Sequence, residues 1–260
     1  ESNKNNLNQE FSVQDGAAIE FRQLTNQLNE YRREINALVK REQAFARYSS
    51  HELRTPLAGA IAQAQRIRSE TQDRSTQARA VEIETTLKRL TRLSERLMQL
   101  ARAEGGRLRL DHSADLRTFA RVVVDDIGRA GPEGRISLRL PETPVMSDLD
   151  PDAFGILCRN LVENALRHGA PASPVKVTLT PDGQLIVAND GPVLPRDALD
   201  RLTNRFERAG SGTDGSGLGL AIVAAIADRF GHRLVLASPR PGSESGFRAS
   251  VTLPTAGAGE

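Results

Sequence analysis

The first hundred residues are predicted to form long helices, because their apolar positions are spaced alternately by four and three residues. The seam consists of Ala17, Phe21, Leu24, Leu28, Tyr31, Ile35, Leu38, Glu42 and Phe45, of which only Glu42 is charged. This spacing is typical of the a and d positions of a heptad and implies a helical partner. A helix from about residue 17 to 69 would be roughly 80 Å long and would not be stable alone in water. We therefore expect a dimer.

A second helix is predicted after a polar break at residues 69–75. Its seam consists of Ile83, Leu87, Leu90, Ser94, Leu97 and Ala101, and it is widened by Leu93 and Leu100. A stripe this wide suits a four-helix bundle better than a two-stranded coiled coil. Two such hairpins, one from each chain, would supply the four helices. Residues 104–106, Glu-Gly-Gly, are expected to end the second helix and to form a hinge.

The pattern changes after residue 106. Short runs at 136–140, 175–180, 184–188, 233–237 and 247–253 predict strands, and stretches near 115–129, 151–168 and 217–230 predict helices. Asp150 is the expected N-cap of the second of these helices, with Pro151 in its first turn. This order of elements favours an α+β domain, in which a mixed sheet carries helices on one face.

Composition narrows the range of functions. The chain of 260 residues is long enough for two modest domains. A net charge of +2 provides no steering field, and two tyrosines without any tryptophan leave few stacking platforms, so we expect no nucleic-acid partner. The one cysteine, Cys158, excludes a disulfide framework within the chain and is expected in the core.

The segment SSHELRTPL at residues 49–57 contains a candidate nucleophile. His51 and Thr55 are four positions apart and would share a helix face. Neutral imidazole is nucleophilic near pH 7, and the Glu52 carboxylate could hold one ring N–H, which leaves the other nitrogen free to attack. Pro56 lacks an N–H and should bend the helix. The alternative is an exposed histidine beside a routine charge.

The segment NLVENALRH at residues 160–168 contains candidate metal ligands. Asn160 and Asn164 would project from one helix face, where their amide oxygens could hold a Mg²⁺ together with phosphate and water oxygens. Arg167 could meet a phosphate, whereas His168 suits the end of a helix as a structural residue. The alternative is that both asparagines brace the sheet.

Two glycine-containing loops are candidate ligand-binding segments. VANDGP at residues 187–192 ends a predicted strand, and GSGLGL at 215–220 opens an apolar helix whose N-terminus would favour an anion. Between them, residues 205–212 are expected to form a mobile segment that closes over a ligand.

The order of these segments resembles the H, N, G1, F and G2 boxes of sensor histidine kinases, over about residues 36–254. The resemblance implies a multidomain fold, in which a long-helix, all-α dimeric four-helix bundle precedes an α+β two-layer sandwich that binds ATP. It divides the chain into a partial HAMP signal-relay helix at 1–35, a dimerisation and phosphotransfer hairpin at 36–104, a hinge at 105–106, an ATP-binding catalytic domain at 107–254 and a loose tail at 255–260.

The resemblance also implies residue roles and two cofactors, ATP and Mg²⁺. His51 would be the phosphoacceptor and Glu52 its base or orienting acid, and Thr55 matches a position linked in the family to dephosphorylation of the partner protein. Asn160 and Asn164 would hold Mg²⁺. The residues expected at the nucleotide are Asn160, Asn164, Arg167, His168, Asn189, Asp190, Gly191, Phe206, Arg208, Gly215, Gly217, Leu218 and Gly219.

The G1 segment departs from the family pattern, which usually reads Asp-x-Gly-x-Gly with the aspartate accepting a hydrogen bond from the adenine amino group. Residues 189–193 read NDGPV. Asn189 can accept through its amide oxygen, but more weakly than a carboxylate. Asp190 could substitute only if the turn shifts by one residue, and Val193 would stiffen the edge of the pocket. We expect weakened nucleotide affinity rather than none.

The implied protein is the cytoplasmic portion of an inner-membrane sensor whose upstream transmembrane segment this chain lacks. It would phosphorylate its histidine with Mg–ATP and pass the phosphoryl group to an aspartate of a cognate response regulator. One alternative is a kinase-inactive dimeric scaffold or phosphatase-biased module. A second is an ATPase related to gyrase and heat-shock chaperones, which is the weaker because its water-activating glutamate would fall at Asn160.

Overall fold

The structure, a computed structural model, describes residues 27, 30–31, 53–105, 108–129, 134–207 and 216–255. The chain divides into one compact unit at residues 1–45 and a second at residues 46–260. Nearly all of the first unit lies outside the described residues, including most of the seam predicted at 17–45 and of the HAMP-like segment at 1–35. The fold described below is that of the second unit.

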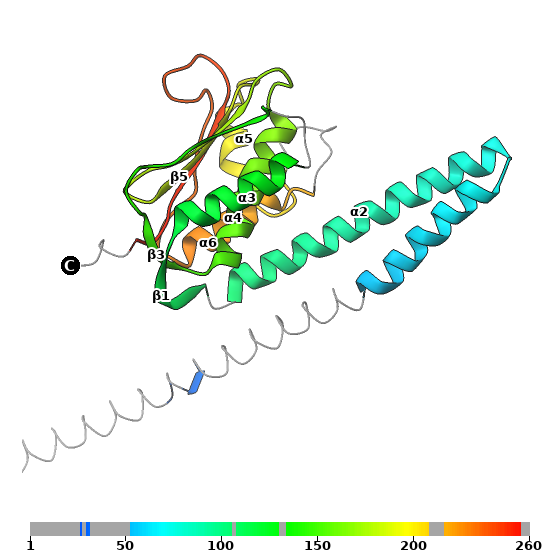
Figure 1. Ribbon diagram of the computed structural model, residues 1–260, viewed down its shortest axis with the longest axis horizontal. Coiled ribbons are helices and arrows are strands. Elements are labelled where there is room, and N and C mark those ends of the chain that lie inside the picture. The colour runs from blue at the N-terminus through cyan, green and yellow to red at the C-terminus, as the bar shows by residue number, and fades with distance from the viewer. Residues whose placement is uncertain are drawn as a thin grey trace, which may run out of the picture. The chain divides into compact units, whose positions relative to one another are not determined.

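A helical hairpin, residues 53–105, consists of a helix at 53–70 and the 32-residue helix α2 (Arg74–Gly105) (Figure 1). The turn at 71–73 falls inside the predicted polar break. Asp73 caps α2, because its carboxylate accepts hydrogen bonds from Thr76 Oγ1 at 2.6 Å and Thr76 N at 2.9 Å. The bond from the Thr76 hydroxyl, followed by that from Ser75, lowers the pKa of Asp73 to about 2.

Glu84 of α2 joins the two helices of the hairpin. Its residue is only 5% exposed, and its carboxylate accepts from Gln65 Nε2 at 2.9 Å and from Arg68 Nη1 at 2.8 Å. Lys88 Nζ lies 2.7 Å from the same carboxylate. The bond from Gln65, followed by that from Lys88, lowers the pKa of Glu84. A carboxylate this well covered requires such partners.

The α+β domain contains a five-stranded sheet in the order β2-β4-β5-β7-β6. β2 (Ile136–Arg139) runs parallel to β4 (Val175–Leu179), whereas β5 (Gln184–Asn189), β7 (Phe247–Thr252) and β6 (Val235–Ala237) continue the sheet in antiparallel pairs. Buried residues alternate along β4 and β5, as expected where one face covers a core. All five strands fall within or at the predicted runs, and the predicted mixed sheet is confirmed.

Helices α3 (Leu116–Arg129) and α4 (Pro151–His168) pack on this sheet, and α6 (Gly219–Asp228) packs against α4 and α2 (Figure 1). Asp150 caps α4 as predicted, because its Oδ1 accepts from Asp152 N at 2.9 Å and from Ala153 N at 3.1 Å. The capped first turn therefore fixes where the asparagine-bearing helix begins.

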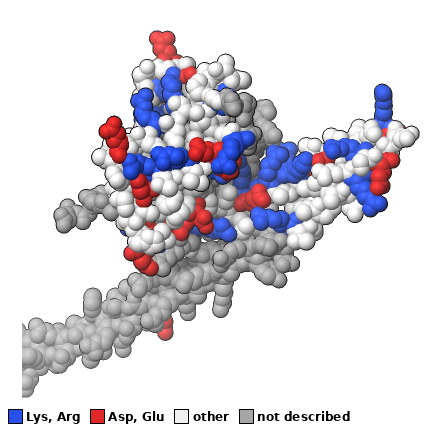
Figure 2. Space-filling model, in the orientation of Figure 1, with Lys and Arg blue, Asp and Glu red and all other residues white. Residues whose placement is uncertain are grey.

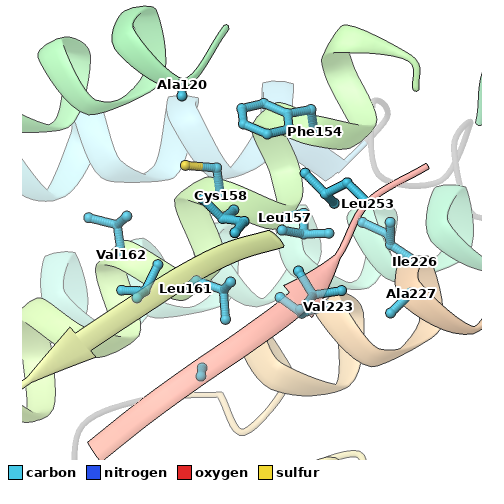
Figure 3. Close-up of a cluster of buried hydrophobic side chains, with 14 of the residues drawn as sticks. Ala120, Phe154, Leu157, Cys158, Leu161, Val162, Val223, Ile226, Ala227 and Leu253 are labelled. Carbon is cyan, nitrogen blue, oxygen red and sulfur yellow. The ribbon is translucent and has the colours of Figure 1, made fainter. Parts of the chain in front are cut away.

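The core lies between α4, α6 and the sheet (Figure 3). Its buried side chains include Phe154, Leu157, Cys158 and Leu161 from α4, Val223 and Ile226 from α6, and Leu253 just after β7. Burial raises the pKa of the Cys158 thiol to about 12, so the thiol stays protonated. The expectation that Cys158 is a core residue is confirmed.

The end of α2 is built into the α+β domain. Leu100 and Ala103 belong to the same buried cluster as the core. The Glu104 backbone oxygen accepts from Arg229 Nη1 at 2.6 Å, and the Glu104 carboxylate accepts from Arg205. Because Gly106 lies outside the described residues, the hinge at 105–106 stays a prediction.

Three elements escaped the sequence prediction. β1 (Arg109–Asp115) and β3 (Met146–Leu149) form a separate antiparallel pair, and α5 (Arg196–Arg201) is a short helix. Helix α6 begins at residue 219 rather than at the predicted 217, because Gly217 has a φ of +66° and cannot belong to a right-handed helix. The predicted fold class, a helical region followed by an α+β domain, is confirmed.

Candidate active site

Asn160 lies in the second half of α4, at the point where α4 meets α2 and α6. It is 5% exposed, and its Nδ2 donates to Ile156 O at 2.8 Å and to Gln99 Oε1 of α2 at 3.3 Å. Its Oδ1 lies 3.3 Å from the point where a Cβ on Gly219 would be. The structure therefore brings Asn160 and the glycine that opens α6 together, as expected for two parts of one site.

The same face of α4 continues through Glu163, Asn164, Arg167 and His168, because residues three and four positions apart share a face. Glu163 Oε2 lies 3.3 Å from an Arg96 guanidinium nitrogen of α2. Asn164 is half-buried and Arg167 is exposed. Burial, followed by repulsion from Arg167, lowers the pKa of His168, so the neutral imidazole predominates at pH 7.

Asn189, the last residue of β5, carries an unused hydrogen-bond acceptor. The residue is 3% exposed, its Nδ2 donates to Asp190 O at 3.1 Å, and its Oδ1 is buried without a hydrogen-bond partner. Gly169 and Gly191 leave room for this side chain, because a Cβ on Gly169 would lie 3.1 Å from Asn189 Cβ and one on Gly191 would lie 3.5 Å from its Nδ2. A buried acceptor without a partner is unfavourable, so this oxygen suits a ligand that donates a hydrogen bond.

Asp190 is engaged elsewhere. Its carboxylate lies 2.6 Å from the Arg240 guanidinium, and its backbone oxygen accepts from Ala170 N at 2.7 Å. Of the two acceptors that the sequence left open, Asp190 is therefore paired, whereas the side-chain oxygen of Asn189 is buried and has no hydrogen-bond partner. This arrangement favours Asn189 as the residue that meets a base.

Phe206 and Gly217 hold the two ends of the segment between α5 and α6 together. Phe206 N donates to Gly217 O at 3.0 Å, and a Cβ on Gly217 would lie 2.7 Å from the Phe206 carbonyl carbon. Only glycine fits so close an approach at a φ of +66°. The backbone of Phe206 is strained, because its φ of +65° lies in the left-handed region. Its side chain is exposed. Leu218, which is fully buried, precedes the first turn of α6.

Four of the predicted site residues, His51, Glu52, Arg208 and Gly215, lie outside the described residues. Thr55 is exposed on the helix at 53–70. The structure brings Asn160 of α4 to Gly219 at the start of α6, and packs Asn189 of β5 against Gly169 just after α4. The functional roles of these residues and of the histidine segment stay predictions.

Three polar residues next to this site were missing from the sequence prediction: Arg96, Gln99 and Glu163. They connect α2 with α4 across 67 and 61 positions of sequence. Arg96 and Gln99 lie off the apolar seam of α2, which was the one available sign that they do not face a bundle core. A polar pair on a helix is too common a feature to predict a site.

The polar groups present fit a nucleotide and a divalent cation. The buried Oδ1 of Asn189 suits the exocyclic amino group of a purine base. The N-terminus of the ten-residue α6, at Leu218 and Gly219, suits phosphate groups. Amide oxygens of Asn160 and Asn164, one helical turn apart, are ligands of the type that Mg²⁺ accepts alongside phosphate and water.

Two family models match the chain. The model of the His Kinase A (phospho-acceptor) domain matches residues 41–106, and the model described as histidine kinase-, DNA gyrase B-, and HSP90-like ATPase matches residues 149–257. With these two domains in this order, the chain belongs to the two-component sensor histidine kinases.

Individual relatives agree with this assignment. Sensor protein QseC of Escherichia coli (strain K12) is 31% identical over 246 residues, which cover 91% of this chain and 53% of that protein. Sensor histidine kinase TrcS of Mycobacterium tuberculosis is 33% identical over 226 residues, which cover 82% and 44%. The crystal structure of full-length ShkA in complex with AMPPNP has the same fold, with a TM-score of 0.60 and 23% identity over 81% of this chain and 45% of that chain. The chain spans about half the length of the curated relatives it matches.

The surface and the helices add two observations. In the part of the chain that the structure describes, no helix is both long and apolar enough to cross a bilayer. On the face shown in Figure 2, lysine and arginine side chains are interspersed with acidic ones along the hairpin and across the α+β domain. This face carries no extended patch of a single sign.

Proposed function

We propose that this chain is the cytoplasmic part of a membrane-bound sensor kinase, and that it phosphorylates His51 with Mg–ATP. The observation that carries the proposal is the buried, unpartnered Oδ1 of Asn189, which provides an acceptor for the adenine amino group. Asn160 and Gly219, which meet at the start of α6, support a phosphate site in the same domain. The two matched family domains support the reaction type.

In the proposed reaction, one ring nitrogen of His51 attacks the γ-phosphorus of ATP. A phosphorus–nitrogen bond forms as the bond to the bridging oxygen breaks, and ADP leaves. Glu52 accepts the hydrogen bond of the other ring N–H, which fixes the tautomer, and takes that proton as the ring is phosphorylated. Mg²⁺, held by Asn160 and Asn164, would supply charge neutralisation at the phosphates, so catalysis consists mainly of positioning and electrostatic stabilisation.

The second proposed step takes place on a separate response regulator. The phosphorus–nitrogen bond breaks as an aspartate oxygen of the regulator bonds to phosphorus, and the ring takes back one proton from Glu52, which returns His51 to its neutral form. Thr55, which is exposed on the helix at 53–70, would assist dephosphorylation of the regulator. In that reaction water attacks the phosphorus, the bond to the aspartate oxygen breaks, and inorganic phosphate leaves. An exposed position is required for either contact with a second protein.

A homodimer is part of the proposal. Ile83, Leu90 and Leu97 are spaced by seven residues along α2 and are 52%, 47% and 42% exposed. Such a regular apolar stripe on a single hairpin is unfavourable in water, and a second hairpin would cover it. The stripe lies on the seam that the sequence predicts, which supports a four-helix bundle made by two chains.

Incubation of the purified chain with γ-labelled ATP and Mg²⁺ tests the proposed reaction. We expect label that is lost in acid and stable in alkali on the wild type, and none on His51→Gln. His112→Gln, at an exposed histidine of β1, is the matched control and should label like the wild type. Label retained by His51→Gln would refute the assignment. A wild type that does not bind nucleotide and is not labelled would favour the scaffold alternative.

A further inference from the structure

A cation from the helical hairpin reaches the phosphate end of the proposed nucleotide site. Arg96 of α2 has a side chain only 16% exposed, and its Nη2 lies 3.3 Å from Glu163 Oε2 of α4. Its Nη1 lies 3.3 Å from the point where a Cβ on Gly219 would be, and Asn160 Oδ1 lies at the same distance from that point. The Arg96 guanidinium therefore lies against both Glu163 of α4 and the first turn of α6.

The charges around Arg96 are unbalanced. Of the groups that act most strongly on it, Arg167 and Arg92 are cations and Glu163 is a carboxylate. Burial, followed by repulsion from Arg167, lowers the pKa of Arg96. A largely buried guanidinium beside other cations and the positive end of a helix is unfavourable without an additional anion, and a nucleotide triphosphate would provide one.

We propose that Arg96 is a phosphate-binding residue that α2 contributes to the nucleotide site, exchanging the Glu163 carboxylate for the terminal phosphate of ATP. The inference rests on the proposed function, because it requires that ATP binds here. A planar guanidinium matches two phosphate oxygens at once, and bonds between ionised partners are stronger than those between neutral ones. Occupancy of the site then favours docking of the ATP-binding domain on α2.

The neighbours of Arg96 on α2 place this contact next to the helix at 53–70, which follows the histidine segment in the sequence. Glu95 Oε1 accepts from Arg54 Nη2 at 3.2 Å, on the helix at 53–70, three residues after His51 in the sequence. Gln99, one turn further along α2, accepts from Asn160 of α4. The same turn of α2 therefore contacts both the helix at 53–70 and the helix that carries the proposed Mg²⁺ ligands.

Calorimetric titration of the full chain with Mg–ATP, Mg–ADP and adenosine tests the inference. We expect Arg96→Ala to weaken ATP binding about tenfold or more, to weaken ADP binding less, and to leave adenosine binding unchanged. Arg89→Ala, at an exposed arginine on α2, is the matched control and should bind all three ligands like the wild type. If Arg96→Ala does not fold, Arg96→Lys replaces it, with a smaller loss specific to ATP because lysine is not bidentate.

Glu163→Gln separates phosphate binding from a simple interdomain ion pair. Removal of the carboxylate frees Arg96, so we expect ATP affinity to rise, and we expect this gain to disappear in the double variant Arg96→Ala/Glu163→Gln. Equal weakening of ATP, ADP and adenosine by Arg96→Ala, or unchanged ATP affinity, would overturn the inference while the wild type still binds ATP. A folded wild type that does not bind ATP would overturn the proposed function as well.

Discussion

Substitution of Asn189 by aspartate tests the base-binding end of the site, because it restores the residue that the family usually carries. In the present chain the amide Oδ1 is buried and unpartnered, and Nδ2 donates to Asp190 O at 3.1 Å. Asn189→Asp would offer the adenine amino group an ionised acceptor. It would also remove the donor to Asp190 and place a charge at a position that is 3% exposed.

The substitution should therefore strengthen ATP binding but destabilise the protein without ligand. A hydrogen bond to a charged group contributes about 1.5–3 kcal/mol and one between neutral groups about 0.5–1.5 kcal/mol, so ATP affinity should rise about tenfold. In the free protein, the lost bond and the unpaired carboxylate should lower the free energy of unfolding by about 1–3 kcal/mol. For a domain of this size, Tm falls by about 2–4 °C for each kcal/mol.

Titration calorimetry and thermal unfolding measure these quantities on the same samples. We expect Asn189→Asp to bind Mg–ATP more tightly and Mg–ITP more weakly than the wild type, because inosine presents a carbonyl oxygen where adenine presents an amino group. The loss in Tm should shrink as ATP is added, since the ligand stabilises the folded state. Asp190→Asn is the control, and it should change stability through its Arg240 pair but leave the preference for ATP over ITP unchanged. Parallel changes for ATP and ITP in Asn189→Asp would refute the reasoning.

Three further predictions concern other parts of the chain. Gly217→Ala should weaken ATP binding by about tenfold or more. A Cβ there would lie 2.7 Å from the Phe206 carbonyl carbon, and the φ of +66° is costly for alanine. Wild-type affinity in titration calorimetry would contradict this prediction. Leu90→Glu should convert a dimer to a monomer in sedimentation velocity, whereas Val122→Glu, at a 60% exposed residue of α3, should leave the dimer intact. Burial lowers the pKa of His168 below its unfolded value of about 6.5, so the unfolded chain binds more protons and the free energy of unfolding should decrease as pH falls below 6.5. Urea unfolding between pH 5 and 7.5 measures the free energy of unfolding at each pH. This free energy should depend less steeply on pH in His168→Gln than in the wild type, and an identical pH dependence would contradict the assignment.

Much of the fold was predictable because local signals mark its elements. Asp150 and Pro151 predict the start of α4, and alternating apolar residues predict β4, β5 and β7. β1 escaped prediction because its sequence, RLDHSAD, is polar and largely exposed. Its partner β3 has only four residues, and their pairing joins Arg109 to Leu149 without a connecting turn that the sequence could mark. The shift in the start of α6 depends on the φ of Gly217, which the glycine pattern allows but does not require.

The candidate site likewise has parts that the sequence predicts and contacts that it does not. Each predicted segment is contiguous, so residue types at short spacing were enough to propose it as part of a site. The Arg96–Glu163 and Asp190–Arg240 pairs join residues that are far apart in the sequence. Such contacts arise only when helices and strands have docked, and neither periodicity nor spacing marks them. The burial of Asn189 likewise follows from the glycines packed against it.

The covered carboxylate of Glu84 limits how the hairpin can move. Sliding one helix past the other by one turn, about 5.4 Å, would carry Gln65 and Arg68 out of reach and leave a carboxylate that is 5% exposed with fewer partners. Axial slippage between the helix at 53–70 and α2 is therefore penalised at this end of the hairpin. Rotation or bending nearer the Arg54–Glu95 contact keeps the Glu84 cluster intact. If the proposed sensor passes its signal along these helices, a twist would disturb fewer of the Glu84 contacts than a translation.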